Sequence, residues 1–475
     1  MQDNFLIAVL IGYLFIGAAL VVTLKGVRGV MACIVIGWIF LPPGRGVNLP
    51  GLPQFTKEFS VSYALMIGVL ISDATRLASF KPRLLDIPML VWILVPLPSS
   101  ITNNLGAYDG FSEVYFNLFI FGVPYLLGRV YIRNPDDVKT VAIWFILAGL
   151  IAAPMALWES RMSPHLNESV YGYRVAKFHM AKRMGGYRPM LFMRHGLEVG
   201  LWMATSSAVA IWLWITTRKQ IRILNWPLPN MSTIVVVATL LSRSLGALIL
   251  LIGTTGAAFF VRTTGLRIVL IALILTPSIY LTIRISNVWA PDQLTAIIRA
   301  FDPDRADSLE SRLGQELNIA QHALEKPVFG WGGHDRYRPQ DEYGHATPVD
   351  GMTTISFGKR GLVGLSALLA MTALPSLLMV LRIKGRSITS SIWAPAVGIM
   401  LALCIYSMDM MFNAFYTPLH IVGIGVIASV AVQTKNWQYA INRHQQMKTY
   451  TSAPNASKNR SVNPNSSNNS KDERS

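Results

Sequence analysis

The sequence has few charged residues and almost no cysteine. Only 14% of its 475 residues are Asp, Glu, Lys or Arg, whereas a soluble globular protein carries about 25%. This scarcity excludes an ordinary soluble domain. The two cysteines, Cys33 and Cys404, both lie in apolar runs, so they form neither a disulfide framework nor a metal-binding pattern.

Long apolar runs are abundant instead. Hydrophobic residues make up 52% of the chain, in runs of about 17 to 23 residues that can cross a bilayer core about 30 Å thick. The first run is uncharged, follows no basic segment and is too long for a signal peptide, so we expect it to be retained. We predict an all-α, polytopic transmembrane helix bundle of about 12–13 spans. The expected spans are 5–24, 27–42, 58–74, 85–101, 113–131, 138–158, 195–217, 230–242, 245–262, 267–283, 356–381, 391–412 and 414–433.

Basic residues alternate between the connections that join these spans. They gather in the odd-numbered connections, such as Lys25 and Arg28 after the first span, whereas the fourth, around 103–113, has none. Because short loops rich in Lys and Arg stay in the cytoplasm, we predict that the N-terminus lies outside and the C-terminus inside.

The C-terminal stretch differs in composition from the rest of the chain. From about residue 435 it is rich in Asn, Ser and Lys, with few apolar residues after Tyr450. Such a segment cannot bury enough apolar surface to fold. We therefore expect a transmembrane domain, 1–434, followed by a disordered cytoplasmic tail, 435–475, which is either simply solvated or contacts anionic lipid head groups.

Two connections, both expected outside, are too long to be simple turns. The first, about 158–194, carries seven Lys and Arg residues against two Glu. Lys and Arg residues are usually rare in loops outside the cytoplasm, so their number here requires an anionic partner, either a polyanionic ligand or acidic lipid. Arginine is suited to a phosphate-containing ligand, because its planar fork of donors matches a phosphate group.

The second long connection, about 284–352, predicts an amphipathic helix. Asp307 and Glu310 have the spacing of a capping box, and apolar residues then recur on one face up to Leu324. Such a helix lies on the membrane or on the protein. Pro327 ends it, and the glycines of 330–333 allow the backbone to approach a ligand closely. A loop of this length without a function is uncommon.

This second connection also holds three histidines, His322, His334 and His345. They and the nearby aspartates are too widely spaced for a metal site. We favour general acid–base work by one His or Asp, and an ordinary place in a surface loop stays open for each histidine.

A few charged residues stand at or inside the predicted spans. They are Glu198, Arg243 and Asp409. Ionisable groups at such depth are costly, which leaves two interpretations, a functional site or a buried ion pair that tethers helices.

Four stretches together resemble the O-antigen ligase and polymerase family of bacterial envelope glycosyltransferases, over roughly residues 110 to 430. The best of them is Arg312 followed by a helix and Pro327-Val328-Phe329-Gly330-Trp331-Gly332, then Asp350-Gly351-Met352 and Gly361-Leu362-Val363-Gly364. The others are Gly128-Arg129, the segment from Arg183 through Arg188 to Arg194-His195-Gly196, and Ser242-Arg243-Ser244-Leu245-Gly246, which looks like the family's Ser-Arg-Gly element.

The resemblance implies a multi-pass enzyme of the bacterial cytoplasmic (inner) membrane that makes O-antigen or exopolysaccharide. It would transfer or polymerise glycan from a polyprenyl (undecaprenyl) pyrophosphate donor to a glycan or lipid acceptor on the outer face, among membrane lipids. No cofactor, metal, nucleotide or nucleic acid is expected. The pyrophosphate would be bound by arginines that neutralise the charge developing on it: Arg183, Arg188, Arg194, Arg243 and Arg312.

The catalytic base is where the chain departs from the family pattern. Family ligases usually carry His-Asn about eleven residues before the Gly of a Gly-Leu-Leu-Gly element. Here Asp350 stands eleven residues before Gly361, so the resemblance points to Asp350, or to His345, as the base. The departure leaves polymerisation, ligation to lipid, transfer to protein and loss of activity open.

Two other classes of function remain. A transporter or flippase of an anionic lipid or solute would also use basic loops and intramembrane charges. It needs those charges near the midplane, between broken helices, whereas this sequence concentrates them in outer loops and at helix ends. A non-catalytic scaffold for envelope assembly is the third interpretation.

Overall fold

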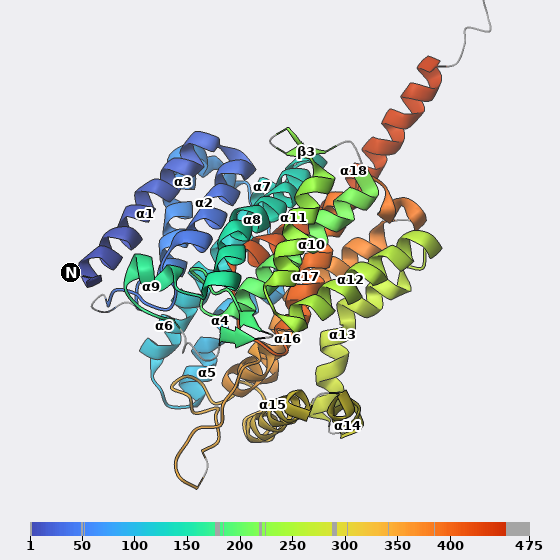
Figure 1. The fold of residues 1–475 in the computed structure, drawn as a ribbon. Coiled ribbons are helices and arrows are strands. Elements are labelled where there is room, and N and C mark those ends of the chain that lie inside the picture. Colours follow the sequence, from blue (N-terminus) through green and yellow to red (C-terminus); the bar gives the residue numbers. More distant parts are fainter. Residues whose placement is uncertain are drawn as a thin grey trace, which may run out of the picture. The chain divides into compact units, whose positions relative to one another are not determined.

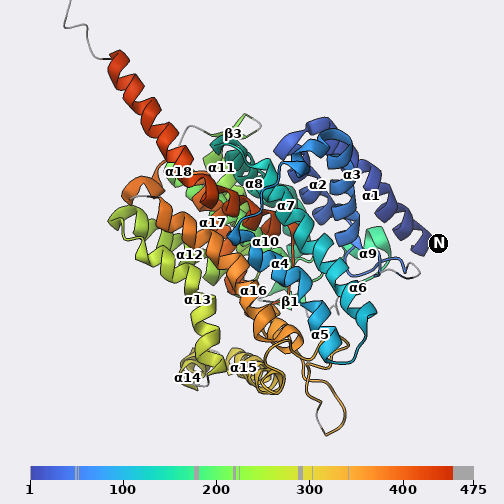
Figure 2. The ribbon, with the colours of Figure 1, turned by 180° about the vertical axis from the view of Figure 1, so that it is seen from behind.

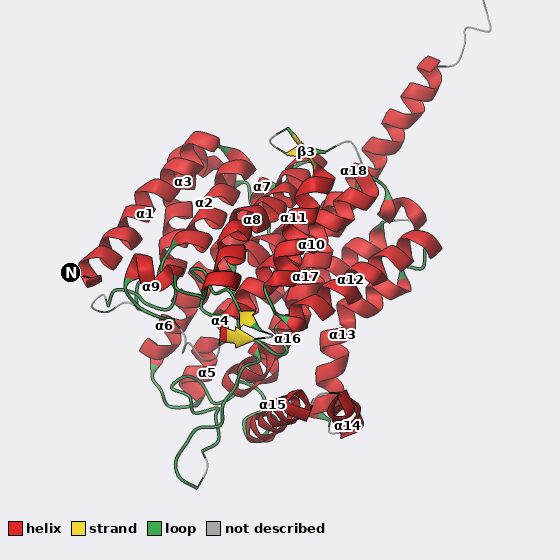
Figure 3. Cartoon of the chain, viewed as in Figure 1, coloured by secondary structure: helices red, strands yellow, loops and turns green. Residues whose placement is uncertain are grey.

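The computed structural model describes residues 2–48, 51, 53–175, 181–183, 185–217, 221–223, 225–286, 292–301, 303–340, 342–383 and 385–452. Helices dominate these residues, with two short hairpins between them (Figure 3). By their internal contacts the residues form two compact units, Met1–Val432 and Gln433–Ser475.

In the described residues, ten helices are long and apolar enough to cross a membrane, which indicates an integral, multi-pass membrane protein. Three further apolar helices are shorter. Together they coincide with the thirteen predicted spans, but at 14–16 residues the three fall below the roughly 17 residues that a span requires. The ten are α1 (Gln2–Leu24), α3 (Lys57–Ala78), η1–α4–α5 (Leu84–Thr102), α6–η2–α7 (Ala107–Tyr131), α8 (Pro135–Met162), α10 (Gly196–Thr217), α12 (Leu245–Thr264), α13 (Ile268–Ile285), α16 (Met352–Arg382) and α18 (Pro418–Ser452); the shorter are α2 (Gly26–Phe40), α11 (Leu228–Leu241) and α17 (Ala394–Asp409).

Helix α10 lies at the centre of the first unit, where it packs against α8, α11, α12 and α17. Most of its residues are buried. Trp202 of α10 is buried and donates a hydrogen bond from Nε1 to the carbonyl of Ala148 in α8, at 3.0 Å. A helix that is apolar all round belongs in such a core.

Four of the span helices in the described residues are broken. In α3 the break is Asp73, with φ −157° and ψ 41°. Proline interrupts the next, so that α4 (Ile87–Leu94) ends just before α5 (Pro96–Thr102). A π-helical turn, η2 (Leu118–Gly122), separates α6 (Ala107–Asn117) from α7 (Val123–Tyr131). In α16 the break is Gly361, with φ 63° and ψ −163°, a conformation open almost only to glycine.

The two long connections fold at the same end of the first unit. An antiparallel hairpin, β1 (Lys182–Arg183) with β2 (Gly186–Tyr187), lies at the lower end in Figures 1 and 2, as do α14 (Asp292–Phe301) and α15 (Pro303–Ala323). The second hairpin, β3 (Arg222–Ile223) with β4 (Trp226–Pro227), lies at the opposite end. The two predicted site loops thus lie at the same end of the first unit.

The amphipathic helix of the second loop forms, although it begins earlier than the sequence predicts. α15 starts at Pro303, a residue whose fixed φ suits the first helical turn. Asp307 and Glu310 are therefore not a capping box. Their carboxylates instead lie 2.9 Å and 2.6 Å from the guanidinium of Arg299. α15 packs against α13 and α16, so it lies on the protein.

The C-terminal segment is helical for longer than its composition suggests. Disorder is expected from about residue 435, yet α18 runs from Pro418 to Ser452. Extending an existing helix adds one hydrogen bond per residue without the cost of a new nucleus, which explains why a polar sequence continues it. The rest of the expected tail, 453–475, lies outside the described residues.

Candidate active site

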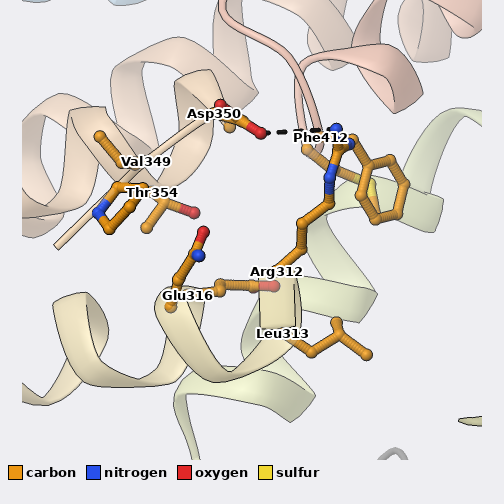
Figure 4. Close-up of a pocket in the computed structure, with 11 residues that line it drawn as sticks. Arg312, Leu313, Glu316, Val349, Asp350, Thr354 and Phe412 are labelled. Carbon is orange, nitrogen blue, oxygen red and sulfur yellow. Dashed lines mark ion pairs between the residues drawn. The ribbon is translucent and has the colours of Figure 1, made fainter. Parts of the chain in front are cut away.

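Arg312 and Asp350 face each other at the lower end of the first unit. The guanidinium Nη2 of Arg312, on α15, lies 3.5 Å from the carboxylate Oδ2 of Asp350 (Figure 4). The side chains are 40% and 55% exposed respectively, so a polar ligand can reach both. The structure therefore brings together one predicted pyrophosphate ligand and the predicted base.

The pair borders a small hollow, which Glu316, Thr354 and Phe412 also line. Its volume is about 30 Å³, enough for roughly two water molecules. A sugar or phosphate cannot enter it, so such a ligand would contact Arg312 and Asp350 from their exposed sides.

Packing on either side of the hollow holds the pair in place. Under α15, Leu313 and Ile319 are buried. On the other side, a Cβ at Gly351 would overlap the carbonyl of Met411, and the amide of Met352 donates to the carbonyl of Asn413 at 3.2 Å. The close approach at Gly351 fixes the position of the neighbouring Asp350.

Glu316 is the second carboxylate at this hollow, one turn along α15 from Arg312. It does not pair with Arg312 as an i,i+4 ion pair would; Tyr280 donates a hydrogen bond to it at 3.0 Å. Burial raises the pKa of Glu316 above its ordinary value, although the hydrogen bond from Tyr280 and the charge of Arg284 oppose the shift.

Two more of the predicted arginines, Arg188 and Arg243, lie against glycines in or next to the first loop. Arg243, between α11 and α12, lies so close to Gly186 of β2 that a Cβ there would overlap its guanidinium. The stem of Arg188 covers Gly196 in the same way. Each glycine thus leaves room for an arginine side chain to lie against the backbone. The backbone of Arg183 pairs with Gly186, whereas its side chain lies outside the described part of the structure.

Arg194 is held by protein groups. Its guanidinium lies 2.7 Å from the buried carboxylate of Glu58 and donates to the hydroxyl of Tyr416 at 2.7 Å. Burial disfavours the charged form, but the charge of Glu58 and the hydrogen bond to Tyr416 outweigh it and raise the pKa of Arg194. Arg194 is 34% exposed, and its donors serve to join helices.

The remaining predicted residues separate from the pair. His345 is exposed and lies beside Tyr343, with ring centroids 6.4 Å apart, rather than lining the hollow. Glu198 is buried and accepts hydrogen bonds from Trp38 at 3.0 Å and from the amide of Arg194 at 2.9 Å. These contacts hold Glu198 within the packing of the helices, but neither of them is the ion pair that the tethering interpretation predicts.

The sequence reasoning missed a second polar site, where Lys359 and Arg360 of α16 meet Glu113 and Asn117 of α6. Lys359 pairs with Glu113, and Arg360 donates to the amide oxygen of Asn117 at 3.2 Å. The available signal was a pair of adjacent cations inside an apolar run, opposite a lone carboxylate at the start of another.

The Pro-x-x-Gly-x-Gly element explains how this second site is built. At Gly330 the backbone lies against the kink of α16, so close that a Cβ there would be 2.6 Å from the amide of Gly361. Trp331 and Gly332 donate to the carbonyls of Gly358 and Lys359 at 2.9 Å and 3.0 Å. The element therefore satisfies backbone groups that the kink leaves open, and it holds Lys359 and Arg360 in place.

In the described ranges, no group of three or more His, Cys, Asp or Glu side chains gathers in a way that could hold a metal ion. No protein-family model matches the chain, and no curated protein matches it in a sequence comparison.

Proposed function

We propose that this protein is a membrane glycosyltransferase that transfers or polymerises glycan from a polyprenyl pyrophosphate donor at the outer face of the bacterial cytoplasmic membrane. The observation that carries the proposal is the contact between Arg312 and Asp350 at 3.5 Å, both partly exposed. A cation for the leaving group and a base for the nucleophile stand within reach of one substrate, which is what group transfer to a hydroxyl requires.

The reaction assigns one role to each member of the pair. The acceptor hydroxyl oxygen attacks the anomeric carbon of the donor glycan, and its proton passes to the Asp350 carboxylate. The bond between that carbon and the pyrophosphate oxygen breaks, and its electron pair leaves with polyprenyl pyrophosphate. Arg312 neutralises the charge that develops on this leaving group.

In this proposal Arg188 and Arg243 form the outer part of the pyrophosphate site. Their positions at the hairpin support this assignment, because the side chain of each one packs directly against a glycine there. Arg194 becomes a positioning residue, because Glu58 and Tyr416 hold its guanidinium. The acceptor is a glycan or a lipid, and the products belong to O-antigen or exopolysaccharide synthesis.

One observation favours a second candidate, a transporter or flippase of an anionic lipid or solute. Arg360 is buried beside the kink at Gly361, and its partner Asn117 directly precedes the π-helical turn η2. Charges between broken helices are typical of transport sites.

A reconstituted assay separates the two candidates. The purified protein is placed in liposomes with a labelled glycan on a polyprenyl pyrophosphate, and both glycan transfer and movement of a fluorescent anionic lipid are followed. Transfer without lipid movement is the expected result. Lipid movement without transfer from any such donor would establish the transport function instead.

A further inference from the structure

A cavity of about 360 Å³ lies between α4, α6 and α16. Its size falls in the range of roughly 300–1,000 Å³ in which proteins bind small molecules. It is distinct from the Arg312–Asp350 hollow, because the first turns of α16 separate them: Thr354 lines the hollow, whereas Ile355 and Ser356 line the cavity.

The most informative group in this cavity is the guanidinium of Arg360, which is only 9% exposed. Nη2 donates to Asn117, and the guanidinium carbon lies 4.1 Å from the ring centroid of Trp92. Among the described residues, Nε and Nη1 of Arg360 have no hydrogen-bond acceptor. Unmet donors on a buried charge are costly, so the guanidinium would gain by turning these donors toward a ligand in the cavity that supplies acceptors.

The charges around the cavity call for an anion. Glu113 is the carboxylate that faces both cations: it pairs with Lys359, and its other oxygen lies 3.8 Å from Nη2 of Arg360. One carboxylate against two cations leaves one positive charge uncompensated. A buried charge requires a partner of opposite sign, and an oxyanion such as a phosphate monoester, with a charge of about −1.5 to −2 at pH 7, would provide it.

The rest of the lining is apolar and aromatic. Phe116, Phe121 and Tyr416 line the cavity with Trp92. The indole N–H of Trp92 is also buried without an acceptor in the described part of the chain. It is a second unsatisfied hydrogen-bond donor next to Arg360. A ligand that fills this space needs an oxyanion at one end and an apolar body next to it.

We propose that this cavity binds a phosphate-headed amphiphile, with the phosphate on Arg360, Lys359 and Trp92 and the hydrocarbon against the aromatic residues. This binding site is additional to the transfer site and does not depend on it. The occupant is a lipid phosphate rather than free inorganic phosphate, since half of the lining would otherwise contact no ligand.

Binding is tested on the full-length protein in neutral detergent, without any glycan donor, by native mass spectrometry. The probes are dodecyl phosphate, inorganic phosphate and uncharged dodecanol. Wild type is compared with Arg360→Gln, Lys359→Gln and Trp92→Phe. Arg133→Gln is the matched control, since Arg133 is an exposed arginine before α8. Circular dichroism and the melting temperature establish that each variant folds.

One dodecyl phosphate should bind the wild type and the Arg133→Gln variant equally. Its affinity should fall at least tenfold in Arg360→Gln and Lys359→Gln, and about fivefold in Trp92→Phe, which loses a single hydrogen bond. Equal binding to the wild type and to the folded cavity variants would overturn the proposal. If inorganic phosphate binds as tightly as dodecyl phosphate, the ligand does not need a hydrocarbon chain, and the proposal of an amphiphile is wrong. If dodecanol binds as tightly as dodecyl phosphate, the ligand does not need a negative charge, and the proposal of an anionic head group is wrong.

Discussion

The guanidinium of Arg312, on α15, and the carboxylate of Asp350, in the segment just before α16, lie 3.5 Å apart. While they are paired, each neutralises the other. A pyrophosphate that binds Arg312 would compete with Asp350 and release its carboxylate to accept a proton. The contact therefore couples binding of the proposed donor to activation of the proposed base.

Replacing Gly361 by alanine should destabilise the protein by about 1–3 kcal/mol. Its φ of 63° and ψ of −163° exclude a side chain, and a Cβ would overlap the carbonyl of Val328. The melting temperature of the purified variant measures the loss. Gly253→Ala is the control, because a Cβ there meets nothing within 4 Å, and alanine in a helix is preferred by about 0.5–1 kcal/mol. Equal melting temperatures for the two variants would contradict the assigned kink.

Gly186→Ala should impair donor binding more than folding. The new methyl group would overlap the end of the Arg243 side chain, which can swing away at little cost but then leaves the proposed pyrophosphate site. We expect the KM for the donor to rise by roughly tenfold, as for the loss of a contact with a charged group. Gly246→Ala, beside Arg243 but with open space around it, should leave KM unchanged. An unchanged KM in Gly186→Ala would remove Arg243 from the site.

Stability should respond to pH through Glu316. Its pKa is raised in the folded protein by burial, so the folded state binds its proton more tightly than the unfolded state does. Glu316 therefore opposes folding increasingly as pH rises from its unfolded value of about 4.3 through the folded pKa. Glu316→Gln removes this penalty while keeping an acceptor for Tyr280. The melting temperature of the variant, relative to that of wild type, should therefore rise as the pH is raised from about 4. A difference that stays constant with pH would refute the assignment.

The membrane helices could be predicted because each depends on local composition. The length of a membrane helix can be read from the length of its apolar run, and α1 covers the run 5–24. The shortness of α2 and α11 was visible in the same way, because their predicted spans, 27–42 and 230–242, are themselves short. That of α17 was not, since its predicted span, 391–412, is longer than the helix. The start of α15 was misplaced because Pro303 and the Asp307–Glu310 spacing both signal a helix start, and the carboxylates serve Arg299 instead.

The sites were harder to predict, because tertiary packing decides them. Nothing local in Arg360 reveals that Asn117 and Trp92 lie against it, and the kink beside it requires the backbone of Gly330. Arg194 resembles the other arginines of its loop in sequence, and nothing local reveals that the buried Glu58 and Tyr416 hold its guanidinium. Arg312 and Asp350 were identified by resemblance alone, and their pairing follows from how α15 packs.

The most direct test of the central claim is the rate of glycan transfer in variants of the pair. Initial rates from a labelled polyprenyl pyrophosphate donor are compared for wild type, Asp350→Asn and Arg312→Gln. Arg133→Gln and Asp136→Asn, at exposed positions around the start of α8, are the matched controls. Loss of the base should lower turnover by about 10²–10⁴-fold and loss of the cation by about 10²–10³-fold, with both controls near wild type. Wild-type turnover in folded Asp350→Asn and Arg312→Gln would contradict the account.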